Sequence, residues 1–143
     1  MNVASILSFK GCDVFTIQPH RTVQEAAQAL TSKGVGALVV CGADGAVCGI
    51  LSERDIMRAI AASGAAALDE PVSRHMTSRV VTTHPLASVD RLMEQMTQHR
   101  FRHMPVIENG RLAGVVSIGD VVKWHVEEID HERQAMRDYI AQA

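Results

Sequence analysis

The apolar positions of this 143-residue chain form the same pattern twice. Each copy begins with a short extended segment that ends at a proline, residues 14–19 and 80–85. A helical stripe follows, with apolar residues at i, i+3, i+4 and i+7 from Val23 in the first copy and from Val89 in the second. The spacing therefore predicts two amphipathic helices at equivalent places.

A predicted β-hairpin and a second helix complete each copy. The strands are 37–41 and 47–51 around Asp-Gly, then 104–108 and 112–116 around Asn-Gly. These dipeptides favour tight hairpins because they tolerate positive φ. The second helices begin at Ser52 and Ser117. The repeated unit is therefore β-α-β-β-α, with a sequence offset of 66 before the turn and 65 after it.

Two such units predict an α+β fold. Each unit is about 50 residues long and is marginal alone, because small chains bury too little surface. We expect tandem β-α-β-β-α repeats packed as a pseudo-twofold pair, followed by a long C-terminal helix. The expected boundaries are 1–66 for the first repeat with its N-terminal segment, 67–126 for a connector and the second repeat, and 121–142 for the helical extension.

The C-terminal helix carries an apolar seam. Its members recur with a period near 3.5, which favours a partner helix in a homodimer. The alternative is a helix folded back on its own domain. The seam consists of Val122, Val126, Ile129, Met136, Tyr139 and Ile140.

Composition narrows the class of protein. The net charge of −2 gives no field for a nucleic acid. No apolar run approaches the ~18 residues of a membrane span, and the first residues lack the cationic start of a secretory signal. Three cysteines without a C-x-x-C motif indicate free thiols in a reducing cytoplasm. We therefore expect a cytoplasmic protein with no membrane or nucleic-acid partner.

The motif Gly-aliphatic-aliphatic-Ser-x-x-Asp leads into each second helix, with Ser52 and Asp55 in the first copy and Ser117 and Asp120 in the second. Ser and Asp at this spacing cap a helix. The same residues follow an apolar strand, where an acidic side chain can accept hydrogen bonds from ribose hydroxyls and the helix N-terminus favours phosphate. Repetition at equivalent strand ends favours a ligand site that caps the helix when empty.

The second copy adds basic residues before its hairpin. Arg100, Arg102 and His103 precede a buried strand, and Arg offers a planar fork for phosphate oxygens. The first copy has only Arg54 within its own motif. We therefore expect unequal sites, with Asp120→Ala weakening binding more than Asp55→Ala if the second copy dominates. The alternative for the basic cluster is a solvated turn, and Lys10 is interpreted as part of a turn or as a phosphate contact.

The sequence offers little support for a metal site or a catalytic site. His99 and His103 are four residues apart, but the helix should end between them, so no metal site is expected. No Ser-His-Asp set, glycine-rich phosphate loop or pair of acids is evident, which argues against an enzyme.

The doubled motifs resemble the CBS-domain family, above all its small stand-alone tandem pairs. The resemblance rests on "GALVV", "GILSERDIM", "RHMPV" and "GVVSIGDVV", which occur in this order along the chain. It implies a regulatory module, usually a homodimer, whose two clefts bind AMP, ADP, ATP, NAD(H) or S-adenosylmethionine. It also implies that an aspartate binds the ribose beside a residue with a hydroxyl group. Basic residues would contact the phosphates, and backbone groups would face the adenine. With Arg54 added, the expected nucleotide-binding residues are Thr16, Ala37, Leu38, Ser52, Arg54, Asp55, Thr82, Arg102, His103, Met104, Pro105, Ser117 and Asp120.

The predicted function is a non-catalytic sensor of energy or redox state that acts on an effector protein the sequence does not identify. Two alternatives stay open. One is a structural or interaction module whose clefts are vestigial, and the other is a small nucleotide-converting enzyme.

Overall fold

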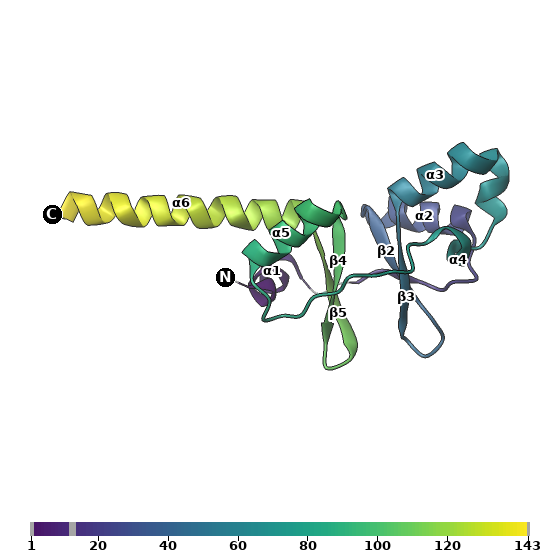
Figure 1. The fold of residues 1–143 in the computed structure, drawn as a ribbon, viewed down its shortest axis with the longest axis horizontal. Coiled ribbons are helices and arrows are strands. Elements are labelled where there is room, and N and C mark those ends of the chain that lie inside the picture. The colour runs from purple at the N-terminus through teal and green to yellow at the C-terminus, as the bar shows by residue number, and fades with distance from the viewer. Residues whose placement is uncertain (1, 12–13, 143) are drawn as a thin grey trace.

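A computed structural model describes residues 2–11 and 14–142 of the chain. Its elements alternate between helices and hairpins, and α6 extends well beyond the rest (Figure 1). In chain order they are α1 (Val3–Lys10), β1 (Thr16–Ile17), α2 (Val23–Lys33), β2 (Ala37–Cys41), β3 (Val47–Ser52), α3 (Glu53–Ser63), the 3₁₀ helix η1 (Gly64–Asp69), α4 (Val72–His75), α5 (Val89–His99), β4 (His103–Glu108), β5 (Arg111–Ser117) and α6 (Ile118–Gln142).

The two halves repeat one sheet pattern, which confirms the predicted fold class. The first half has the strand order β1-β2-β3, with β1 parallel to β2 and β2 antiparallel to β3. The second half pairs β4 with β5 antiparallel. Its predicted first strand, residues 80–85, is reduced to a single parallel bridge between Thr83 and Val106. Asn109 and Gly110 both adopt positive φ, as the hairpin prediction requires.

Each half has its own apolar core. The first core gathers Val23, Leu38 and Leu51 with Val72 from α4. The connector therefore packs against the first half as the short helices η1 and α4. The second core gathers residues of α5, β4 and β5, and it also takes Val3, Ile6 and Leu7 from α1. Residues 1–66 were predicted to go together, but α1 lies with the second half because its apolar face is buried there.

Two cysteines, Cys41 and Cys48, are free thiols. Burial raises the pKa of the Cys41 thiol, with smaller contributions from Cys48 and Asp44. Cys12 lies outside the described residues.

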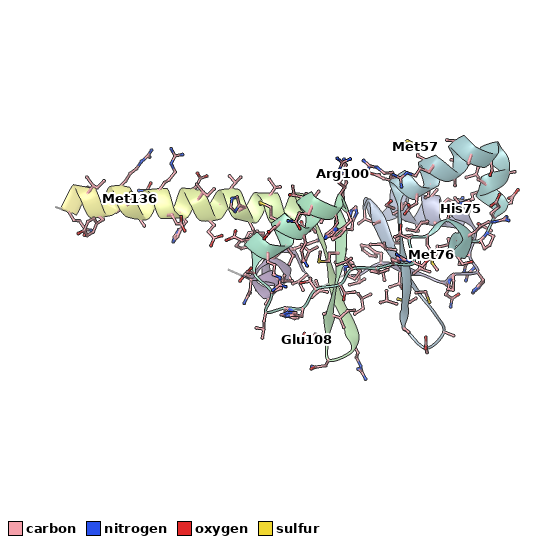
Figure 2. The ribbon with its side chains drawn as sticks, in the orientation of Figure 1. Met57, His75, Met76, Arg100, Glu108 and Met136 are labelled. Carbon is pink, nitrogen blue, oxygen red and sulfur yellow. The ribbon has the colours of Figure 1, made fainter. Side chains whose placement is uncertain are left out.

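The predicted long C-terminal helix is present as α6, which has 25 residues and so spans about 37 Å. Only its first turns pack on the protein, and Met136 lies far out on the projecting part (Figure 2). Every member of the apolar seam is exposed. The seam therefore does not fold back on the chain, and its role in a homodimer stays a prediction. Among the described helices, none combines the length and the apolar content that crossing a membrane would require.

Candidate functional site

Both Ser-x-x-Asp motifs cap the helix that follows, as the sequence predicted. The Ser52 hydroxyl accepts the backbone N–H of Asp55 at 3.2 Å, and Asp55 Oδ2 accepts the N–H of Ser52 at 2.9 Å. Ser117 and Asp120 repeat both bonds at 3.2 and 2.9 Å. Each aspartate is thus held at the N-terminus of a helix, where the helix dipole favours its negative charge.

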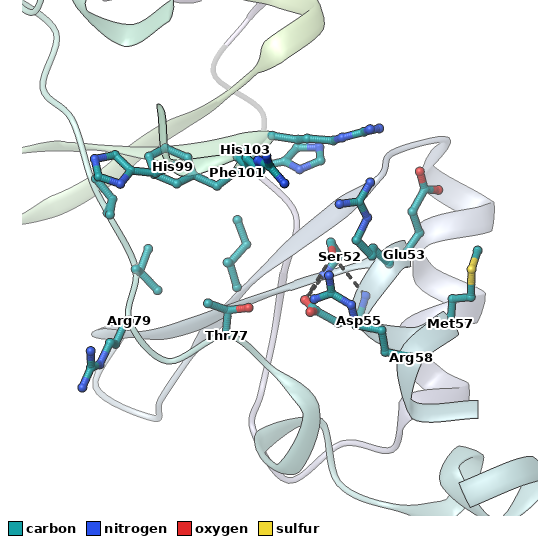
Figure 3. A pocket seen from close by; sticks show the side chains of 16 residues that line it. Ser52, Glu53, Asp55, Met57, Arg58, Thr77, Arg79, His99, Phe101 and His103 are labelled. Carbon is teal, nitrogen blue, oxygen red and sulfur yellow. Dashed lines mark hydrogen bonds between the residues drawn. The ribbon is translucent and has the colours of Figure 1, made fainter. Parts of the chain in front are cut away.

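A cavity of about 610 Å³ opens beside Asp55 and lies between the two halves (Figure 3). We call it the Asp55 cleft. It falls within the range of ~300–1,000 Å³ that is typical of small-molecule sites. One wall is the start of α3 and another is the segment from His99 to His103. The connector closes the third side with Thr77, Arg79, Val80 and Val81.

The charge of the Asp55 cleft is opposite in sign to that of the whole chain. Five arginines line it against two carboxylates, Glu53 and Asp55, although the chain has a net charge of −2. The arginines are Arg54, Arg58, Arg79, Arg100 and Arg102. Convergent guanidinium groups in one concave wall create a positive field that attracts anions.

The second half contributes basic residues to the cleft beside Asp55. The main chain of Arg102 belongs to the second half, since its carbonyl accepts the N–H of Ile118 at 2.8 Å. Its side chain nevertheless lines the cavity beside Asp55. His103 pairs with Ser117 in the β4–β5 register, so its predicted grouping with Ser117 and Asp120 stays a prediction. Packing of the halves also brings the start of β4 to the start of α3, beside Asp55.

His103 lies where the two halves meet. A Cβ added to Gly36, just before β2, would come within 3.5 Å of its Nε2 atom. Burial lowers the pKa of His103, and the nearby charge of Lys10 lowers it further against the opposing effects of Glu53 and Asp120. Burial therefore favours the neutral imidazole, and a bound anion would favour its protonation.

Asp120 is already engaged within the protein. The Lys10 ammonium donates to Asp120 Oδ2 at 2.6 Å and to the carbonyl of Val115 at 2.8 Å. Burial would raise the pKa of Asp120, but hydrogen bonds from Lys10 and Ser117 and the charge of Lys10 outweigh burial and hold that pKa below its usual value. Lys10 is thus neither a simple turn residue nor a member of the Asp55 cleft: it neutralises the second aspartate.

The expected site residues divide into two groups. Ser52, Arg54, Asp55, Arg102 and His103 line the Asp55 cleft. The others do not line it. Leu38, Met104 and Pro105 are buried, Ala37, Ser117 and Asp120 are half-buried, and Thr16 and Thr82 are exposed.

Sequence reasoning missed several residues of the cleft. Arg58 follows Arg54 by one helical turn, so i, i+4 spacing places both on one face and could have identified it. His99 and Phe101 stack with ring centroids 5.9 Å apart. The connector residues, such as Arg79, carried no signal, since only the tertiary packing brings them to the cavity.

Comparison with known protein families also finds two copies of one unit in the chain. A family model described as the CBS domain matches residues 8–62 and again residues 72–127. The chain belongs to the CBS domain family. The resemblance inferred from the motifs is therefore confirmed, and the two matches make the chain a CBS-domain pair.

Relatives share the whole CBS pair. The mitochondrial CBS domain-containing protein CBSX3 of Arabidopsis thaliana is 41% identical over 123 residues, which cover 83% of this chain and 60% of the plant protein. A crystal structure of a CBS-domain protein from Agrobacterium tumefaciens is 52% identical with a TM-score of 0.83, and the match covers 85% of this chain and 91% of that one.

A second crystal structure shows the same fold at lower identity. The CBS domain pair of protein MJ0100 was crystallised with 5′-methylthioadenosine and S-adenosyl-L-methionine. It is 23% identical with a TM-score of 0.80, and the match covers 90% of this chain and 98% of that one.

Proposed function

We propose that this CBS pair is a non-catalytic regulatory module that binds an adenosine nucleotide in the Asp55 cleft. The observation that carries the proposal is a capped aspartate that faces a cavity lined by five arginines. Both Ser52 bonds to the Asp55 carboxylate end on Oδ2, so Oδ1 is left for the hydroxyls of a ribose. The adenosine ligands of the MJ0100 pair support the ligand class.

The charge of the cleft favours a polyphosphate. ATP and ADP present more negative charge to the arginines than AMP does, and NAD(H) presents a pyrophosphate. Methylthioadenosine has no phosphate, and S-adenosylmethionine carries a positive sulfonium. We therefore rank ATP first, followed by ADP, then NAD(H) and AMP, with S-adenosylmethionine last.

Apolar residues provide a surface for the base. Ile50, Val80, Val81 and Phe101 line the same cavity, and an adenine ring can stack or pack against such side chains. In Figure 3 the row from His99 to His103 lies across the cavity from Ser52 and Asp55. This arrangement suits a ribose at Asp55, a base on the apolar wall and phosphates among the arginines.

The second aspartate is proposed as a weaker site. A nucleotide at Ser117 and Asp120 would have to displace Lys10 from the carboxylate. The backbone contacts expected at Ala37–Leu38 and Met104–Pro105, and the base contacts expected at Thr16 and Thr82, stay predictions.

Binding could reach a partner through α6, which begins at the second motif and projects from the protein (Figure 1). Ligand between the halves would favour one relative placement of the repeats. Homodimerisation, an effector protein and a cytoplasmic location likewise stay predictions.

Calorimetry with the full chain tests the proposal. ATP, ADP, AMP, NAD(H) and S-adenosylmethionine are titrated at low and high salt, with thermal unfolding in parallel. We expect the affinity order given above, a loss of ATP affinity at high salt and a rise in Tm with ATP by mass action. No binding of any compound at millimolar concentration would sink the proposal and favour a structural module, while product formation after incubation would favour an enzyme.

Arg100 is expected to lower the stability of the fold and to raise the affinity for ATP. It ends α5 in the left-handed conformation, at φ 57°, where the first repeat has Gly34 at φ 65°. Arg100→Gly should stabilise the fold by about 0.5–1 kcal/mol, since relief of left-handed strain exceeds the entropy that glycine adds to the unfolded chain. The same change should weaken ATP binding about fivefold by removing one exposed charge.

The control for this prediction is Arg100→Gln, which keeps a side chain in the strained conformation and removes only the charge. It should weaken ATP binding equally without stabilising the fold, as measured by urea denaturation and calorimetry. A loss of stability in Arg100→Gly would contradict the assignment of strain.

A further inference from the structure

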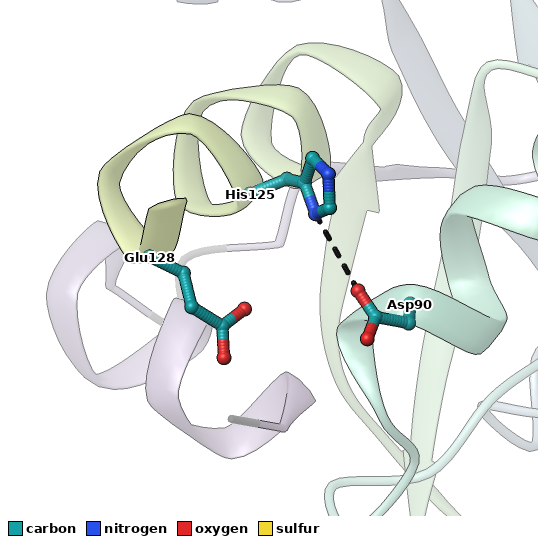
Figure 4. A group of neighbouring side chains, drawn as sticks. All are labelled: Asp90, His125 and Glu128. Carbon is teal, nitrogen blue, oxygen red and sulfur yellow. Dashed lines mark ion pairs between the residues drawn. The ribbon is translucent and has the colours of Figure 1, made fainter. Parts of the chain in front are cut away.

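A second polar cluster lies away from the Asp55 cleft, where α6 crosses α5. His125 and Glu128 are three residues apart and so share one face of α6, and Asp90 belongs to the first turn of α5 (Figure 4). One imidazole nitrogen and one oxygen from each carboxylate all lie within 4.8 Å of one another. One His and two carboxylates are a ligand set that divalent transition metals accept.

The Nδ1 atom of His125 is a buried polar atom that lacks a hydrogen-bond partner among the described residues. Buried polar atoms are usually satisfied, so an orphan of this kind calls for an explanation. Asp90 Oδ1 lies 3.4 Å from this nitrogen, beyond the ~2.7–2.9 Å of a charge-assisted hydrogen bond.

That separation suits two ligands of one ion. With Zn–N and Zn–O bonds of about 2.0–2.2 Å, neighbouring ligands of a tetrahedral zinc lie roughly 3.3–3.5 Å apart. An ion between Nδ1 and Oδ1 would use the imidazole lone pair and satisfy the orphan atom. A rotation of the half-buried Glu128 side chain or of the exposed Asp90 side chain could complete three protein ligands, and water would occupy the fourth position.

The surroundings hold the ligands and leave an approach. Val89, Leu92 and Val121 are buried in the core that joins α5 to α6, so the backbone of both helices is fixed beside the cluster. The Asp90 side chain is 78% exposed, and that of His125 is 37% exposed, which allows an ion to enter from solvent.

We propose that Asp90, His125 and Glu128 form a binding site for a divalent transition metal ion, with zinc as the best fit. Such an ion would cross-link the base of α6 to α5. The histidine pair weighed in the sequence, His99 and His103, takes no part. The site was missed there because Asp90 lies 35 positions before His125, and only the packing of the two helices brings them together.

The test uses the full chain after treatment with a chelator. Zn²⁺ is titrated by calorimetry, and Co²⁺ is followed by its visible absorption. We expect one ion per chain and a higher Tm with zinc. Asp90→Asn, His125→Gln and Glu128→Gln should each weaken binding by about tenfold or more. The matched control is His131→Gln, an exposed histidine on the same helix, which should bind as the unaltered chain does.

Circular dichroism without metal checks that each variant is folded, and Asp90→Asn stays informative in any case because that side chain is so exposed. Zinc affinity in all three ligand variants equal to that of the unaltered chain would overturn the proposal. A thiolate-to-cobalt charge-transfer band would overturn it as well, since it would place the ion on a cysteine. Failure to take up zinc at ~100 μM would do the same, and none of these outcomes bears on nucleotide binding.

Discussion

Asp55→Ala is expected to weaken ATP binding by about tenfold to a hundredfold, whereas Asp120→Ala changes it less than threefold. A hydrogen bond to a charged acceptor is worth about 1.5–3 kcal/mol, and the Asp55 carboxylate faces the arginine-lined cavity. Asp120 is engaged by Lys10 at 2.6 Å and lies outside that cavity. Calorimetry with ATP on the two variants measures the difference.

The two aspartates are matched controls for each other. Each caps a helix through the same Ser-x-x-Asp bonds, so each alanine variant loses a cap worth about 1 kcal/mol. A difference in ATP affinity therefore reports on the site and not on the cap. A larger effect at Asp120 would contradict the structure-based ranking and restore the order that the sequence predicted.

Gly49→Ala is expected to destabilise the protein by about 2–3 kcal/mol. A Cβ at this position would lie 2.8 Å from the carbonyl oxygen of Thr77 and 2.7 Å from the sulfur of Met76. Ile50 and Thr77 exchange two backbone hydrogen bonds at 3.0 and 2.9 Å, so the connector cannot move away without losing them. Overpacking of this kind costs about 1–3 kcal/mol, and the backbone contact puts it at the upper end. Urea denaturation measures the loss.

The equivalent glycine in the second repeat provides the control. A Cβ at Gly114 would meet Leu7 Cδ2 at 2.7 Å, which is the end of a side chain and can rotate. Gly114→Ala should therefore cost about 1 kcal/mol. Gly49→Ala should also weaken ATP binding, because Thr77 lines the Asp55 cleft. An equal or larger loss of stability in Gly114→Ala would show that the contact with Thr77 is not the cause.

The two motifs share one spacing and one structural role, but their chemical surroundings differ. Both glycines admit a neighbouring element, and both Ser-Asp pairs start a helix. The chemistry differs because different neighbours arrive. Thr77 and the basic segment before β4 come to the first motif, whereas Lys10 comes to the second.

The amino-acid sequence by itself determined what depends on near neighbours along the chain. The two α-β-β-α segments, both helix caps, the Asn109-Gly110 turn and the long C-terminal helix all follow from local spacing and backbone preference. The first strand predicted for the second unit forms only as the bridge between Thr83 and Val106. Asp55, Arg54 and Ser52 could likewise be assigned to one site from sequence, because they share a single turn at the start of α3.

Only the tertiary structure decided which residues from distant segments meet. Burial of the apolar face of α1 carries Lys10 to Asp120, and the packing of the halves carries Arg102 and His103 to Asp55. These side chains are directed by the three-dimensional arrangement of the two cores, which no local pattern encodes. The repeat could therefore be predicted, but the partner of each aspartate depended on burial of apolar surface elsewhere in the chain.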